Sequence, residues 1–167
     1  MTLSGAIHTL DELCRNPRGG LPEELFLFIS RMTPLVNVDL LIREPDRGTL
    51  LTWRSDHHHG NGWHIPGGII RFQETAQQRI HAVARGELGA AVDFDPDPIA
   101  LTEVIDRTSP VGNRGHFISL LYRCRLRSPL DSRLEAVEPP GAGSWRWHSH
   151  PPADLIQAHE TYRRFMA

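Results

Sequence analysis

Apolar and polar positions follow two different periods along the chain, and together they predict short strands with a few helices. Residues 35–42 and 49–54 are rich in branched apolar side chains and flank Asp46-Arg47-Gly48, so they predict a β-hairpin. Residues 75–88 carry apolar side chains on one helical face, and Gly89 follows as a left-handed helix stop. We also expect a helix at 22–32, a strand and tight turn over 63–68, strands at 99–105, 117–126 and 145–147, and a closing helix at 153–165. This order favours an α/β sandwich with a mixed β-sheet.

The first 20 residues differ from the rest of the chain. They are mostly polar and end in Asn16-Pro17-Arg18-Gly19-Gly20, a sequence typical of a loop. The remaining length suits one domain with a substantial core. We therefore expect an N-terminal segment at 1–20 and a single domain at 21–167.

Charge and composition exclude several classes of function for this protein. All 18 basic residues are arginine, which excludes chemistry that needs a lysine, such as a Schiff base or a Walker-type phosphate site. The net charge of −2 gives no general attraction to nucleic acid or to a membrane surface, so we expect a small-molecule partner. Two distant cysteines and the absence of a signal or membrane-spanning pattern predict a cytoplasmic protein.

Gly68, Glu74, Glu87 and Gly89 have a characteristic spacing, and a Trp-x-x-Pro-Gly-Gly sequence precedes them. The stretch resembles the Nudix box, G-x5-E-x7-R-E-U-x-E-E-x-G-U, where U is a bulky aliphatic residue. In this chain Ala82, Val83 and Gly86 replace the arginine, the first paired glutamate and the penultimate glutamate. The resemblance implies a Nudix-type α/β/α sandwich and a hydrolase. It also implies that Glu74 and Gly89 are structural residues of the box.

The departures from the box resemble one subgroup, the GDP-mannose mannosyl hydrolases, which also keep only the last glutamate. Residues 33–39, 50–54, 116–118 and 146–147 resemble strands of that subgroup. The resemblance implies a homodimer that hydrolyses a nucleoside diphosphate sugar such as GDP-mannose with Mg²⁺, or with Mn²⁺ as an alternative. The subgroup's glutamine and histidine, a metal ligand and the general base, align with Gly141 and Ala142, so the usual base is missing.

The position of Glu87 points to a cation without reference to a family. It lies on the apolar face of the predicted helix, four residues after Val83, and in the last turn. A carboxylate loses hydration there and opposes the negative end of the helix dipole, so it needs a positive partner. Mg²⁺ completed by a backbone carbonyl of Gly67 or Gly68 would supply one. The alternative is a solvated helix-end glutamate that pairs with Arg54 or Arg85.

Several other polar residues are candidates for the site. Arg54, at the end of a strand, is a phosphate-binding and catalytic candidate, and otherwise a surface arginine. His116 is an acid–base or substrate-binding candidate. Asp39, among apolar neighbours, is either an acceptor for sugar hydroxyls or a buried structural group. Arg71 is the arginine nearest to the box glycines and a substrate-binding candidate.

Two further patterns leave alternatives open. With Ala82 at the position of the box arginine, Arg79 or Arg85 is the candidate partner of Glu74. His57-His58-His59, with His64 or with His148 and His150, could bind a transition metal. For the protein as a whole, the alternative to a hydrolase is a Nudix-fold module that binds nucleotides but has lost turnover.

Overall fold

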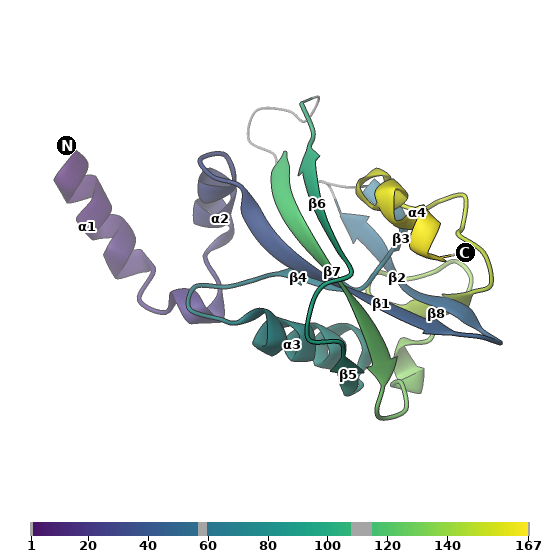
Figure 1. The fold of residues 1–167 in the computed structure, drawn as a ribbon. Coiled ribbons are helices and arrows are strands. Elements are labelled where there is room, and N and C mark those ends of the chain that lie inside the picture. Colours follow the sequence, from purple (N-terminus) through teal and green to yellow (C-terminus); the bar gives the residue numbers. More distant parts are fainter. Residues whose placement is uncertain (1, 57–59, 108–114, 167) are drawn as a thin grey trace.

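A mixed sheet organises the computed structural model, which describes residues 2–56, 60–107 and 115–166 (Figure 1). The strands are β1 (Leu35–Glu44), β2 (Gly48–Asp56), β3 (Gly60–His64), β4 (Gly67–Ile69), β5 (Val92–Phe94), β6 (Ala100–Ile105), β7 (His116–Leu126) and β8 (Trp145–His148). The main path runs β3-β2-β1-β7-β5, while β4, β6 and β8 pair with β1, β7 and β2. Strands β1 and β7 are parallel and the other pairs are antiparallel. The predicted mixed sheet and hairpin are confirmed.

Strand β1 changes its antiparallel partner halfway along its length. Asn37 to Asp39 pair with β4, whereas Arg43 and Glu44 pair with β2. The same strand stays parallel to β7 from Leu35 to Ile42. The first half of β1 therefore carries its polar side chains beside the glycines of β4.

Helical layers cover both faces of the sheet. On one face α3 (Ala76–Leu88) packs Ile80, Val83 and Leu88 against apolar residues of β1. On the other face the C-terminal segment, with a 3₁₀ turn η3 (Gln157–Tyr162) and α4 (Arg163–Met166), buries Tyr162 and Met166 in a second cluster. Figure 1 shows α3 and α4 on opposite sides of the strands. The predicted α/β/α sandwich is confirmed.

The ends of α3 follow its sequence. The Thr75 hydroxyl accepts from the Gln78 N–H, and the Gln78 side chain accepts from the Thr75 N–H, which forms a capping box. At the other end Gly89 adopts a left-handed conformation with φ 60°. Both predicted bounds of this helix are confirmed, and they set where Glu87 lies.

The predicted closing helix over 153–165 is wrong over residues 153–156. Asp154 accepts a bond from the Trp63 N–H and Ile156 donates one to the Trp63 carbonyl, so the chain stays extended beside β3. Helical structure therefore begins only at Gln157. Strand β3 also begins at Gly60, before the strand expected from residue 63, and the sequence pattern does not predict β5.

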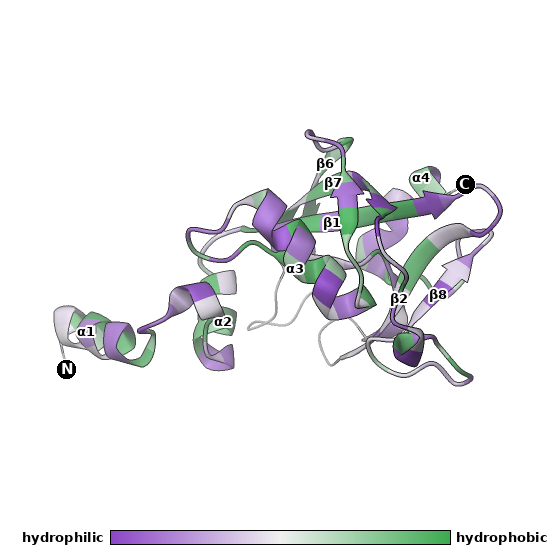
Figure 2. Ribbon diagram, turned by 90° about the horizontal axis from the view of Figure 1, so that it is seen from below, coloured by the Kyte–Doolittle hydropathy of each residue, from purple (hydrophilic) through white to green (hydrophobic). Residues whose placement is uncertain are grey.

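The N-terminal part forms helices of its own. They are α1 (Leu3–Leu13), the 3₁₀ turn η1 (Pro17–Gly19) and α2 (Glu23–Ser30). Both views place α1 away from the sheet, and within the described residues it buries none of its side chains (Figures 1 and 2). The helix expected at 22–32 is confirmed, whereas α1 was not predicted.

Candidate active site

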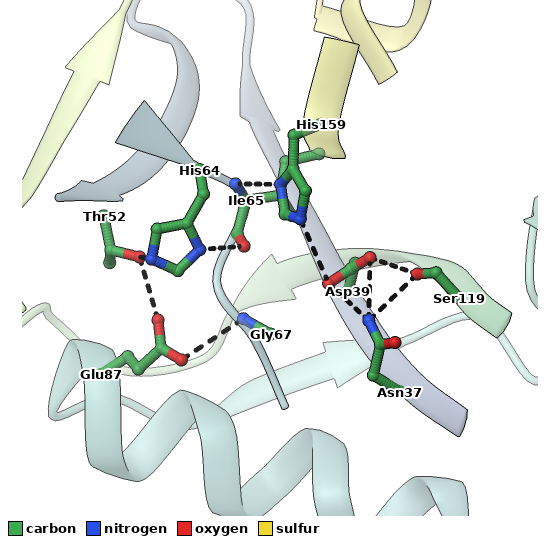
Figure 3. Close-up of polar contacts among 9 residues, drawn as sticks. All are labelled: Asn37, Asp39, Thr52, His64, Ile65, Gly67, Glu87, Ser119 and His159. Carbon is green, nitrogen blue, oxygen red and sulfur yellow. Dashed lines mark hydrogen bonds and ion pairs between the residues drawn. The ribbon is translucent and has the colours of Figure 1, made fainter. Parts of the chain in front are cut away.

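Glu87 projects from the last turn of α3 toward β2 and β4 (Figure 3). Its Oε2 accepts a hydrogen bond of 2.9 Å from the Thr52 hydroxyl, and its Oε1 accepts one of 3.4 Å from the Gly67 N–H. Burial raises the pKa of Glu87 to about 7, and the bond from Thr52 and the charge of Arg54 offset only part of this effect. Glu87 is thus a bonded, half-buried side chain rather than a freely solvated helix end, while the charge of Arg54 acts on it as that alternative expected.

The bonds around Glu87 continue to His64. The Thr52 hydroxyl lies 3.0 Å from His64 Nε2, and His64 Nδ1 lies 2.8 Å from the Ile65 carbonyl. A carbonyl only accepts, so Nδ1 carries a hydrogen. The Thr52 hydroxyl donates to Glu87 and also contacts His64 Nε2, so it links the two side chains in one polar network.

The two glycines of β4 present different atoms to this site. The Leu40 N–H bonds to the Pro66 carbonyl, and the Ile70 N–H bonds to the Val36 carbonyl. In an antiparallel pair, every second residue points its backbone N–H and C=O toward the partner strand. Gly68 lies opposite Val38, midway between these two bonds, so its N–H and C=O point toward β1. The N–H and C=O of Gly67 point away from β1, in agreement with the bond from the Gly67 N–H to Glu87. Of the two candidate carbonyl ligands, Gly67 is the one that faces outward beside Glu87.

Neither glycine position tolerates a side chain. A Cβ on Gly67 would overlap the Asp39 carboxylate, and one on Gly68 would lie 2.9 Å from Val83 Cγ2. The absence of side chains lets β4 pass between the carboxyl groups of Asp39 and Glu87, which lie on either side of it (Figure 3).

Asp39 lies in a second polar cluster, on β1. Its carboxylate is only 1% exposed, and it accepts from the Ser119 hydroxyl and, at 3.3 Å, from the Asn37 amide. Burial raises the pKa of Asp39 to about 6 despite these bonds. The residue also lines a cavity. Asp39 is therefore a buried, hydrogen-bonded group that borders the cavity, and its role as an acceptor for sugar hydroxyls stays a prediction.

His159, on η3, joins this cluster to the glycine turn. Its Nδ1 accepts a 3.0 Å bond from the Ile65 N–H, so its remaining hydrogen is on Nε2 when the ring is neutral. That atom lies 4.0 Å from Asp39 Oδ1. The histidine therefore ties the C-terminal segment both to the start of the turn and to Asp39.

A cavity of about 230 Å³ brings most of the candidates together. Its lining includes Asn37, Asp39, Arg54, Gly67, Gly68, His116, His64 and His159. Glu87 lies behind Gly67 rather than on the wall. His116 bonds to Glu103 at 3.1 Å, at the edge of this space. Sequence reasoning missed His64 as part of this site and missed His159 altogether.

Glu74 and Arg71 lie outside this cavity. The Glu74 carboxylate accepts from Arg79 Nε at 2.8 Å and from the Arg71 N–H at 2.9 Å. Against the effect of burial, these bonds lower the pKa of Glu74. Of the two arginines expected opposite Glu74, Arg79 is the partner, one turn before the position of the box arginine. The Arg71 side chain lines a separate cavity beside the N-terminal segment.

A divalent cation needs several oxygen or nitrogen donors around it. Among the residues that the structure describes, no three His, Cys, Asp or Glu side chains are grouped closely enough to hold an ion. One carboxylate, Glu87, and one outward backbone carbonyl, Gly67, are hard oxygen donors that suit Mg²⁺ when other oxygens complete its shell. They fit a single weakly held cation. His57 to His59 lie outside the described residues, so the proposed histidine site has no structural account.

A glycine turn beside the last carboxylate of the central helix is the arrangement that the resemblance to the Nudix box implies. A family model described as the NUDIX domain matches residues 33–167, and the chain belongs to this family. It is therefore a Nudix-type hydrolase, as the box residues imply. Nudix hydrolases act on small-molecule nucleotides and generally use a divalent cation.

The chain is also similar to individual proteins of known sequence or structure. The chain is 28% identical over 134 residues to the low-salt glycan biosynthesis protein Agl8 of Haloferax volcanii, covering 76% of this chain and 85% of that protein. A MutT Nudix hydrolase from Burkholderia pseudomallei shares the fold with a TM-score of 0.62 at 20% identity, over 81% of this chain and 99% of the other. A MutT protein from Methanosarcina mazei Go1 gives 0.59 at 17% identity, over 80% and 94%. No described helix is long and apolar enough to cross a membrane.

Proposed function

We propose that the protein is a Mg²⁺-dependent hydrolase of a nucleoside diphosphate linked to a sugar, with GDP-mannose as the representative substrate. The observation that carries the proposal is the cavity in which hydroxyl-binding groups of β1 face an arginine and the glycine turn beside Glu87. A sugar offers hydroxyl donors and a diphosphate offers anionic oxygens, so this lining is complementary to both. The name of the Agl8 relative, which refers to glycan biosynthesis, supports a sugar-linked substrate.

Asp39 and Asn37 would bind the sugar. The carboxylate of Asp39 takes hydrogen bonds from Ser119 and Asn37, which fix its orientation toward the cavity. An ionised carboxylate accepts strongly from a hydroxyl, so a sugar hydroxyl is the ligand that suits it. His116 at the cavity edge would contact the same part of the substrate and is the acid–base candidate there.

Arg54 and the cation would hold the diphosphate. Arg54 lines the cavity, and its charge already lowers the pKa of Glu87, so it lies near enough to act on the same substrate group. Glu87 and the Gly67 carbonyl would hold Mg²⁺, or Mn²⁺ as the alternative, together with phosphate oxygens. When bound, the cation would neutralise charge that develops on the departing phosphate group. Water would attack either the anomeric carbon, which releases the nucleoside diphosphate, or a phosphorus of the diphosphate, which releases a nucleoside monophosphate and a sugar phosphate.

A second candidate function is nucleotide binding without turnover. Val83 and Gly86 stand where the box has glutamates, which leaves Glu87 as the box carboxylate beside the turn. A site with so few donors binds a cation weakly, so a binding module is the alternative that this observation favours. The homodimer, the cytoplasmic location and the division into 1–20 and 21–167 remain predictions.

A substrate screen separates the two functions. Nucleoside diphosphate sugars are incubated with Mg²⁺ or Mn²⁺, and both turnover and thermal stabilisation are measured. Release of GDP and mannose from GDP-mannose shows that the linkage between sugar and diphosphate is hydrolysed, whereas GMP and mannose 1-phosphate show that the diphosphate itself is cleaved. Stabilisation without either product supports the binding module. No turnover and no stabilisation with any of these substrates would refute the proposal.

A further inference from the structure

His159 is a buried histidine that lines the cavity of the candidate active site, although it lies on η3 in the C-terminal segment, far from the box in sequence. Its Nδ1 accepts the 3.0 Å bond from the Ile65 N–H. A ring nitrogen that accepts a hydrogen bond carries no hydrogen of its own, so the hydrogen of the ring is on Nε2. Nε2 is therefore a donor, and it points toward Asp39 Oδ1, 4.0 Å away (Figure 3).

The ring of His159 is held on several sides. Besides the bond from Ile65, it has two edge-to-face neighbours: the ring of His64, with centroids 5.7 Å apart, and the ring of Tyr162, at 5.3 Å. The bonds that Asp39 accepts from its neighbours on β1 and β7 fix its carboxylate in the same way. A donor and an acceptor that are already fixed lose little conformational entropy when a ligand binds.

The gap between His159 Nε2 and Asp39 Oδ1 is too long for a hydrogen bond between them. An oxygen atom that lies between them, at about 2.8 Å from each, can bond to both. This oxygen must accept from the histidine and donate to the carboxylate, and a hydroxyl group does both through one atom. An ionised phosphate oxygen accepts but has no hydrogen to donate. The pair therefore favours a hydroxyl over a phosphate.

The glycine turn leaves room for such an oxygen and separates it from the cation. A Cβ on Gly67 would overlap Asp39 Oδ1, and glycine has none. Asp39 and Glu87 lie on either side of the turn, so the pair is on the opposite side from the carboxylate that would hold Mg²⁺ (Figure 3). A substrate whose diphosphate binds at the cation would thus direct a different part of itself to Asp39 and His159.

We propose that His159 and Asp39 together hold one hydroxyl group of the sugar, which makes His159 a specificity-determining residue. This inference rests on the proposed function and deepens it, because it adds a hydrogen-bond donor to the carboxylate already assigned to the sugar. The hydroxyl accepts from Nε2 and donates to Oδ1. The pair selects a sugar with a hydroxyl at this position over one without it, since the loss of the hydroxyl leaves two buried polar groups without their ligand.

Two substitutions separate the roles of the two ring nitrogens. His159→Asn places an amide oxygen near the position of Nδ1, so it keeps an acceptor for the Ile65 N–H but removes the donor. His159→Gln places its amide near the position of Nε2, so it keeps a donor. Calorimetry with a chelator present, which prevents metal-dependent turnover, measures the binding of GDP and of GDP-mannose. His159→Asn should weaken GDP-mannose binding about tenfold and leave GDP binding unchanged, whereas His159→Gln should bind both within about threefold of wild type.

Analogues of GDP-mannose that each lack one sugar hydroxyl identify the group that is bound. Wild type should bind one of them at least about tenfold more weakly than GDP-mannose. His159→Asn should bind that analogue as tightly as wild type does, because the partner of Nε2 is already absent. His81→Asn, on α3 and against Phe94, is the matched control and should bind every ligand as wild type does. Circular dichroism verifies that each variant folds.

The outcomes distinguish the inference from the proposed function. If His159→Asn keeps the wild-type ratio of affinities for GDP-mannose and GDP, the inference is wrong while the proposed function stands. Slower hydrolysis by this variant at an unchanged ratio would place the pair at the attacking water instead and would equally overturn the inference. It is also wrong if wild type binds every deoxy analogue as tightly as GDP-mannose, whether or not the variants fold. If wild type binds neither ligand and hydrolyses no nucleotide sugar, the proposed function and the inference fail together.

Discussion

Replacing Glu87 with glutamine should change how the stability of the protein depends on pH. In the folded protein burial raises the pKa of Glu87 from 4.5 to about 7. A carboxyl whose pKa is raised by folding contributes stability that is fully present below its unfolded pKa, and this contribution is lost as the pH rises through the folded value. At about 1.4 kcal/mol per pKa unit, the full loss for wild type is about 3 kcal/mol between pH 4.5 and about 8. Glutamine keeps the size of the side chain but does not titrate.

Urea unfolding of both proteins at several pH values, with a chelator present, measures this effect. Asp39, whose pKa is also raised, is common to wild type and variant, so the difference between them reports Glu87 together with its repulsion by Asp39. Glu87→Gln should be the more stable protein at about pH 8, and the difference should shrink toward about pH 5. A difference in stability that is the same at both ends of this range would refute the buried, high-pKa carboxyl.

Further substitutions test the other parts of the site. Arg54→Ala should weaken nucleotide binding by about 1.5–3 kcal/mol in calorimetry, because a charged hydrogen bond to phosphate is lost, and unchanged affinity would assign Arg54 to the surface. His159→Ala leaves the buried Ile65 N–H without its acceptor and should lower the free energy of unfolding by about 1–3 kcal/mol, whereas an unaltered urea midpoint would contradict that bond. Arg79→Ala should lower the melting temperature more than Arg85→Ala, because Arg79 bonds to Glu74 and Arg85 is exposed on the same helix, and equal effects would contradict this pairing. Mg²⁺ affinity should fall about tenfold per pH unit below about pH 7, since protons compete for Glu87, and a pH-independent affinity would exclude it as a ligand.

The sequence predicts the central helix and the hairpin well because local patterns determine them. Thr75 and Gln78 form the capping box and Gly89 ends the helix, so both bounds of α3 are encoded within a few residues. The closing helix is less predictable. The local sequence at residues 154–156 does not exclude a helix. Their backbone bonds to Trp63 keep them extended, and no local pattern reveals that distant partner.

The candidate site divides in the same way. Glu87 can be found from sequence because a charged residue on an apolar helical face requires a partner. His64 and His159 cannot, because their roles depend on partners brought together by the fold. The bond from Ile65 to His159 joins residues 94 positions apart. The contact of Glu74 with Arg79 is partly predictable. The sequence narrows the partner to Arg79 or Arg85, and the fold brings Arg79 to the carboxylate.

The most direct test of the proposed hydrolase compares the Mg²⁺ dependence of GDP-mannose hydrolysis by wild type and by Glu87→Gln, with products separated by chromatography. The proposed site predicts that wild type releases product only when Mg²⁺ or Mn²⁺ is present, and that the variant folds but has lost this turnover. Equal turnover by the two proteins, with the same response to Mg²⁺, would contradict the assignment of Glu87 as the residue that holds the cation.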